Sequence, residues 1–214
     1  ILDMVHNNPG ETAYITKYNN PSFLKTQGFT GTVPHWHINC AITYDNYGNI
    51  LQDSEKEWIE RKAFEIEKKI EEFHSEGIEV FPFTDFIIFP QSIWKKYAHD
   101  ITYKNEQYKP DLNKPKTKEL LIAQIDGIFK RFPALDGLTL RFGETYLHDT
   151  PFHQGNSPIR KGTEGIQDHI TLLKLLREEI CVKRNKKLFY RTWDFGFNFH
   201  NNPTCLLYTS PSPR

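Results

Sequence analysis

The sequence predicts an α/β fold, a partial (β/α)8 TIM barrel of about five βα units. Short apolar segments with strand character alternate along the chain with longer segments of helical periodicity. Such alternation indicates parallel strands joined by crossover helices. A doubly wound sheet is the competing fold, but no G-x-G-x-x-G turn follows the first strand. Because a complete barrel needs eight units and ~250 residues, we expect a barrel that is cut short after its fifth strand.

Five segments have the composition of strands. Four are short apolar runs bounded by turn residues, and one lies in a longer stretch that is closed by Asp45-Asn-Tyr-Gly48. The predicted strands are Ile1–Val5, a segment that ends in Ala41–Tyr44 within Gly31–Tyr44, Ile78–Phe83, Leu138–Phe142 and Lys187–Thr192. Residues Asp85–Pro90 are expected to form the loop after the third strand.

Three longer segments between these strands have helical periodicity. They are residues 54–76, Thr117–Arg131 and Ile166–Val182. Ser54, with Glu57 three residues later, predicts a capping box at the start of the first helix, and Gly77 predicts its end. Signals for a further short helix after the first strand are weak.

Charge and composition exclude several functional classes. Lys+Arg and Asp+Glu number 27 each, so the formal net charge is zero, which argues against a dedicated nucleic-acid-binding protein. No run approaches ~18 consecutive apolar residues, so no membrane span is expected. The three Cys form neither a disulfide framework nor a zinc knuckle. Aromatic residues make up 14% of the chain, which suits stacking on sugar rings but is also common in plain globular domains.

Both ends of the sequence are unusual. The chain begins with Ile1 inside an apolar run, and residues 205–214 resemble the translation of a sequencing adapter. A natural flexible tail is the alternative interpretation of these last ten residues. We therefore expect residues 1–204 to be a truncated catalytic domain of barrel type, from a metagenomic gene fragment, and residues 205–214 to lie outside the fold. The sequence indicates no oligomeric state.

Polar side chains cluster where the predicted strands end. In a (β/α)8 barrel these positions form one mouth, and active sites lie there. The candidates are Asn7 and Asn8 after the first strand, Asp45 after the second, Asp85 after the third, Arg141 and Tyr146 around the end of the fourth, and Arg191 and Trp193 at the fifth. Such a mouth suits a ring with many hydroxyl groups, so we expect a carbohydrate substrate.

Glu144 is the candidate catalytic residue. It follows the strand Leu138–Phe142, and Gly143 lets the backbone bend before it. Apolar surroundings from Phe142 and Tyr146 would raise its carboxyl pKa toward that of a general acid. The alternative is a carboxylate that only forms a salt bridge at the barrel mouth.

Histidines give a second, metal-based hypothesis. His35-Trp-His37 has the H-x-H spacing of some metal-dependent barrel hydrolases, but it falls at the start of the predicted second strand, the wrong end for a mouth. A zinc site needs three or four converging ligands, and the sequence does not assemble them, so no metal and no other cofactor is predicted. His153, in the long loop after Glu144, is expected to hydrogen-bond substrate. Trp36 and Trp193 are candidate stacking platforms, although packing is as common a role for Trp.

The chain resembles a bacterial glycoside hydrolase group. The resemblance is carried by Met4–Glu11 (M-V-H-N-N-P-G-E), by Arg141-Phe-Gly-Glu144-Thr-Tyr, by His153-Gln-Gly155 and by Tyr190-Arg-Thr-Trp193. More distantly, over residues 77–204, it is similar to the alpha-glucuronidases of glycoside hydrolase family 67. That resemblance implies that Glu144 is the general acid and that Arg191 matches the Arg of the fifth strand. The sequence itself indicates no location, and the resemblance is compatible with a periplasmic or extracellular one.

Two departures from the alpha-glucuronidases bear on the mechanism. Leu140 stands where that family has a Lys four residues before the acid, and the basic residue here is Arg141. The family's catalytic base comes from later strands that this chain does not contain. An inverting enzyme needs acid and base carboxyls ~6.5–9.5 Å apart, and Asp85 and Asp194 are the nearest local candidates. Arg141 or Arg191 would bind a uronate carboxylate. A metal-dependent hydrolase and a non-catalytic carbohydrate-binding barrel are the alternatives.

Overall fold

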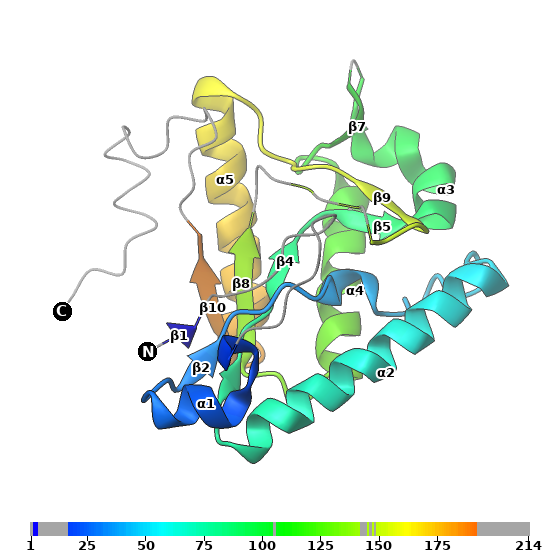
Figure 1. Ribbon diagram of the computed structural model, residues 1–214. Helices are drawn as coiled ribbons and strands as arrows, with labels where there is room; N and C mark the ends of the chain where they lie inside the picture. Colours follow the sequence, from blue (N-terminus) through cyan, green and yellow to red (C-terminus); the bar gives the residue numbers. More distant parts are fainter. Residues whose placement is uncertain are drawn as a thin grey trace.

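The chain folds as a mixed α/β protein, seen in a computed structural model (Figure 1). The structure describes residues 2–3, 17–104, 106–141, 145, 147 and 149–191, with the backbone alone for residues 2–3 and 106–108. The strands are β1 Leu2–Asp3, β2 Gly31–Thr32, β3 Glu79–Val80, β4 Phe83–Asp85, β5 Ile88–Pro90, β6 Thr102–Tyr103, β7 Glu106–Pro110, β8 Gly137–Arg141, β9 His153–Gly155 and β10 Lys187–Tyr190. The helices are α1 Pro21–Thr26, α2 Asp53–Ser75, α3 Gln91–Ile101, α4 Pro115–Arg131 and α5 Gly162–Leu176, the last continued by a π-helical stretch, Arg177–Val182.

The parallel strands lie side by side in chain order. One sheet has the order β1-β2-β3 and the other the order β10-β8-β4, and every neighbouring pair in both is parallel. Backbone hydrogen bonds continue across the two residues between β3 and β4, since the Phe81 amide donates to Thr32 (2.9 Å) and the Thr139 amide to Pro82 (3.0 Å). The expected alternation of parallel strands and helices is confirmed. Sequential order of this kind is shared by (β/α)8 barrels, and the count of five barrel units stays a prediction.

The two faces of this sheet differ in what covers them. Leu138 and Leu140 of β8 belong to the main apolar core, which the buried faces of α2, α4 and α5 complete. Side chains alternate along a strand, so Thr139 and Arg141 point the other way. On that second face Phe81 and Phe83 form a small separate apolar cluster with Val33. The helices therefore cover one face, and the other carries the candidate site residues of β4 and β8.

The predicted helices are present, with shifted starts. The first begins at Asp53, and its capping box is formed by Gln52 and Glu55 rather than by Ser54 and Glu57. The Gln52 amide donates to Glu55 at 2.8 Å. The second starts two residues earlier than expected, at Pro115, where a proline fits the first helical turn. The third starts at Gly162, before the expected Ile166, and ends in the π-helical turn.

The predicted second strand is mostly wrong. Only Gly31–Thr32 is strand, and Ile38–Cys40 forms one turn of 3-10 helix whose residues are all buried. The apolar run that suggested a strand up to Tyr44 instead fills the core as an irregular segment. Asp45 consequently lies away from the sheet edge and pairs with Lys130 of α4 at 2.6 Å, with both side chains exposed.

A layer that the sequence did not predict lies beyond the carboxyl ends of β4 and β8. The expected loop Asp85–Pro90 contains the end of β4 and all of β5, and β5 pairs antiparallel with β9 from the segment after β8. Helix α3 and the β6–β7 hairpin follow β5 and complete this layer (Figure 1). Gly155 permits the pairing, because a Cβ there would collide with the backbone of Ile87 and Ile88. Within the described residues, no helix is both long and apolar enough to cross a bilayer.

Candidate functional site

Three of the predicted site residues meet at one edge of the parallel sheet. Asp85 is the last residue of β4, Arg141 is the last residue of β8, and the two stand opposite each other in the strand register. Arg191 directly follows β10, which is the next strand. Because the strands are parallel, all three residues lie at their carboxyl ends. This edge is where the sequence predicted a mouth.

Arg141 and Asp85 form a buried, two-point ion pair. Arg141 Nε donates to Asp85 Oδ1 at 2.7 Å, and its Nη2 atom pairs with Asp85 Oδ2. The side chains are 2% and 4% exposed. The same Nη2 lies 3.0 Å from His35 Nε2, and Asn39 Nδ2 donates to the Asp85 carbonyl at 2.9 Å. The pair therefore joins two strand ends to the segment after β2. The predicted contact of Arg141 or Asp85 with substrate would require this pair to open.

Phe83 lies close to the guanidinium groups of both Arg141 and Arg191. Its ring centre lies 5.9 Å from Arg141 Cζ and 5.7 Å from Arg191 Cζ. The His35 ring meets the Phe83 ring edge to face at 6.2 Å. Cations close to an aromatic face are attracted by the ring quadrupole. Phe83, which is 1% exposed, is thus a buried ring close to both positive charges, and it was not among the residues predicted from the sequence.

The H-x-H pair lies at the opposite end of the strand from the one expected. Since β2 ends at Thr32, His35 comes after its carboxyl end and reaches Arg141. The rings of His35 and His37 are 4.6 Å apart, and His37 has a positive φ of 53°. Burial lowers the pKa of His37 to about 4, assisted by the positive charges of Lys62 and Arg141 and opposed by Asp149. His37 is thus neutral at pH 7.

His153 lies in the core rather than on an open loop. It is the first residue of β9 and is 5% exposed, with its ring 5.2 Å from the ring of Trp58. Burial lowers its pKa to about 3, with a smaller contribution from His37, while a backbone hydrogen bond at Cys40 acts in the opposite direction. The predicted hydrogen bond from His153 to substrate would require this part of the core to open. Trp36, half-buried, packs against Phe73.

Five predicted site residues lie outside the described residues. They are Asn7, Asn8, Glu144, Tyr146 and Trp193. In the sequence, Glu144 follows Arg141 by three positions. Asp194, a candidate base, also lies outside the described part. The roles assigned to these residues stay predictions.

The described residues offer no ready metal site. Among them, no three His, Cys, Asp or Glu side chains converge as metal ligands would. His35, which the sequence analysis weighed only as a metal ligand, is instead a neighbour of Arg141. Its role could have been found from the sequence only if the end of β2 had been placed correctly.

Comparisons with known proteins establish no family. No model of a protein family matches the chain, and no curated protein sequence matches it. Among solved structures, the crystal structure of Dispersin B is similar, with a TM-score of 0.46 and 14% identity over 85% of this chain and 62% of that chain. The chain thus spans less than two thirds of that protein's length. A likeness of this extent carries no argument about activity, and the resemblance to family 67 stays a prediction.

Proposed function

We propose that this chain is part of a glycoside hydrolase whose catalytic domain is a (β/α)8 barrel, of which residues 1–204 supply about five units. Support comes from the sheet, whose parallel strands lie in chain order with helices against one face. The carboxyl ends of these strands collect Asp85, Arg141 and Arg191, as active-site edges of such barrels collect polar side chains.

The observation that carries the proposal is the ion pair between Arg141 and Asp85. It fixes the end of β8 against β4, so the segment that bears Glu144 starts from an anchored point. A general acid must be held within hydrogen-bond reach of the leaving oxygen. Glu144 would protonate the glycosidic oxygen, and a second carboxylate would activate water or attack the sugar. Asp85 is a poor choice for that second group because Arg141 already binds both of its oxygens.

Arg191 supports the narrower proposal of an acidic sugar substrate. Its guanidinium lies beside the apolar Phe83 ring at the same edge. A guanidinium binds a carboxylate through two parallel hydrogen bonds. An alpha-glucuronidase-like activity on plant-type oligosaccharides would use Arg191 in this way.

The test needs the complete product of the reading frame that contains this sequence. The source DNA is sequenced beyond codon 204, and the product of the complete frame is assayed on aryl glycosides and uronic-acid oligosaccharides. We expect Glu144→Gln to lower turnover by ~10²–10⁴-fold while sugar binding, measured by calorimetry, survives. Glu164→Gln is the matched control, since Glu164 is an exposed carboxylate on α5.

Other outcomes would contradict the proposal. Unchanged turnover in Glu144→Gln would remove Glu144 as the acid. Loss of turnover on chelation, with stoichiometric metal in the purified protein, would favour a metal-dependent barrel hydrolase. Sugar binding with no turnover in the complete protein would favour a non-catalytic carbohydrate-binding barrel.

A further inference from the structure

A concave surface lies on the added layer, and neither Arg141 nor Asp85 lines it. It is an open groove of about 640 Å³ between α3, the start of the β6–β7 hairpin and the residues Lys114 and Gln154. None of the candidate site residues lines it. We call it the α3 groove. Its volume is in the range of small-molecule sites.

The floor of the α3 groove is apolar. Trp94 and Ala98 are one helical turn apart on α3 and face the groove together. Trp94 is 2% exposed, so its ring is packed into the core and only its edge reaches the floor. Ala98 is small, and its short side chain leaves the space open. The half-buried ring of Tyr103 on β6 forms the end wall.

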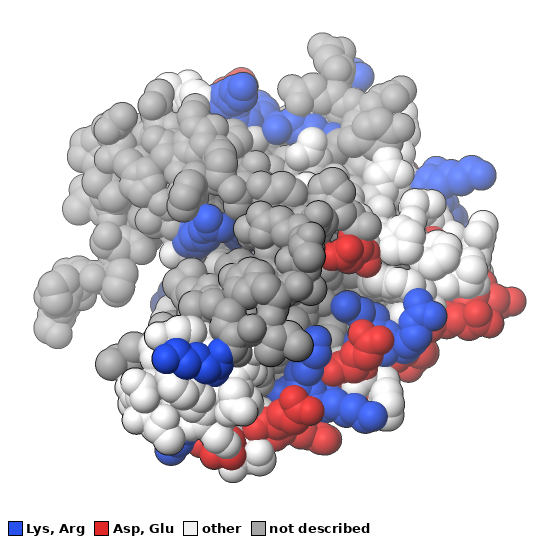
Figure 2. Space-filling model, viewed as in Figure 1, with Lys and Arg blue, Asp and Glu red and all other residues white. Residues whose placement is uncertain are grey.

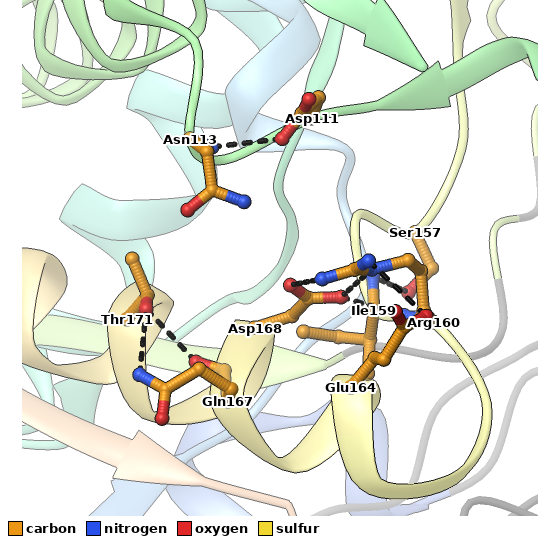
Figure 3. Close-up of polar contacts among 9 residues, drawn as sticks. All are labelled: Asp111, Asn113, Ser157, Ile159, Arg160, Glu164, Gln167, Asp168 and Thr171. Carbon is orange, nitrogen blue, oxygen red and sulfur yellow. Dashed lines mark hydrogen bonds and ion pairs between the residues drawn. The ribbon is translucent and has the colours of Figure 1, made fainter. Parts of the chain in front are cut away.

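Tyr103 is held in place from behind. The Arg160 guanidinium carbon lies 4.9 Å from the Tyr103 ring centre. Arg160 in turn binds both oxygens of Asp168, at 2.7 and 2.8 Å, and Glu164 at 3.1 Å (Figure 3). Two carboxylates therefore pair with the single charge of Arg160, which does not line the groove. The cation beside Tyr103 is already paired.

The rim of the α3 groove is positively charged. Lys95 and Lys104 are exposed at its edge, and neither forms an ion pair with any residue that the structure describes. Lys114 lines it as well, with its Nζ donating to the His99 carbonyl at 2.8 Å. None of the described residues that line the groove is Asp or Glu. Basic side chains stand over α3 in Figure 2, whereas the surface over α2 mixes both signs. In a chain of zero net charge, this is a local excess.

We propose that the α3 groove binds a small organic carboxylate with a planar, apolar body. The body would lie against Trp94, Ala98 and Tyr103, and the carboxylate would be held by Lys95 and Lys104. An apolar floor with a few polar groups at the edge is the usual composition of a ligand site. The excess of cations selects an anionic ligand over a neutral one of the same shape. The inference does not depend on the proposed hydrolase activity.

The test is a direct binding measurement on the complete product of the reading frame that contains this sequence. The probe is 2-naphthoate, titrated by calorimetry, with the uncharged 2-naphthalenemethanol as its matched analogue. We expect saturable binding of 2-naphthoate and affinity at least about fivefold weaker for the alcohol. The double variant Lys95→Gln/Lys104→Gln should weaken 2-naphthoate binding by about tenfold. The control Lys96→Gln/Lys161→Gln removes the same charge from exposed positions that do not line the groove, and should bind as the unchanged protein does.

A further variant, Ala98→Leu, tests whether the ligand binds inside the α3 groove, because it fills the space there. Ala98→Leu places a larger side chain inside the groove and should abolish binding, with folding checked by circular dichroism and thermal melting. Three results would overturn the proposal: no saturable binding, equal affinity for the alcohol, or equal weakening by the control pair. If Ala98→Leu does not fold, the lysine variants alone decide. The experiment measures binding and not turnover. Its outcome therefore does not depend on whether Glu144 is the general acid.

Discussion

The guanidinium of Arg141 binds both carboxylate oxygens of Asp85 across the ends of two neighbouring strands, and both side chains are almost fully buried. A buried charge that loses its partner is left without compensation. The pair also holds His35, so it ties the segment after β2 to the ends of β4 and β8. The arrangement of this sheet edge therefore depends on Arg141 and Asp85.

Removal of one partner of this pair should destabilise the fold strongly. We expect Asp85→Asn to lower the free energy of unfolding by about 3–5 kcal/mol, measured by urea denaturation. The control is Asp45→Asn, which breaks an ion pair with Lys130 whose side chains are 62% and 69% exposed; it should cost less than about 1 kcal/mol. Equal losses in the two variants would contradict the buried pair.

Glu55 should be a second buried carboxylate on which the fold depends. Its Oε2 accepts from the Gln52 amide at 2.8 Å, its Oε1 accepts from the Ser92 amide at 2.9 Å, and the residue is 2% exposed. It thus joins the starts of α2 and α3. Glu55→Ala leaves both amides unpaired and should cost about 1–3 kcal/mol.

The control for Glu55 is Glu57→Ala, two positions along the same helix and exposed. Surface substitutions of this kind usually change stability by less than about 0.5 kcal/mol. The two variants also test the helix start, because the sequence favoured Glu57 in the capping box. A larger loss for Glu57→Ala would restore that assignment.

The helices and the parallel order of the strands could be predicted because each depends on local pattern. Apolar spacing in α4 and α5, for instance, is visible within one segment. The strand β5 could not be predicted, because its partner β9 lies more than sixty residues later and its three residues have no period of their own. Likewise, the apolar residues Ile38–Cys40 suggested a strand but fill the core as a 3-10 turn.

The sequence predicted where the residues of the candidate site lie, but it did not predict which of them contact each other. The ends of β4 and β8 were placed within one or two residues, so Asp85 and Arg141 were found at one edge. That they bind each other depends on the strand register, which no single segment specifies. His35 was placed at the wrong end of β2 because the strand is shorter than its apolar surroundings.

Stability should fall as the solution becomes acidic. Burial lowers the pKa of His37 to about 4, that of His153 to about 3 and that of His169 to about 4. In the unfolded chain a histidine has a pKa of ~6.5, so the unfolded state binds protons first. Stability is therefore complete above pH ~6.5 and is lost as the pH falls toward the folded pKa values. At pH 5 the loss should be on the order of 1–2 kcal/mol for each histidine.

His37→Asn isolates one of these contributions. Asn tolerates the positive φ of this position and does not titrate. The difference in unfolding free energy between pH 7 and pH 5 should shrink in this variant, and it should not change in His99→Asn, whose side chain is fully exposed. All three proteins contain the same carboxylates, so the comparison between them isolates the histidine that is replaced. An unchanged pH dependence in His37→Asn would show that His37 is not buried in its neutral form.

Gly137 should not accept a side chain unless the neighbouring strand moves. It starts β8 opposite Lys187 of β10, and a Cβ there would lie inside the contact radius of the Lys187 carbonyl oxygen. Gly137→Ala must push the two strands apart, which should cost about 2–4 kcal/mol in urea denaturation. Gly162→Ala is the control: it has a positive φ of 71° but open space around it, so it should cost only the left-handed strain of about 1–2 kcal/mol. If Gly137→Ala costs no more than Gly162→Ala, β8 and β10 do not pair in the register Gly137 to Lys187. The carboxyl ends of these strands would then no longer bring Arg191 beside Arg141 and Phe83.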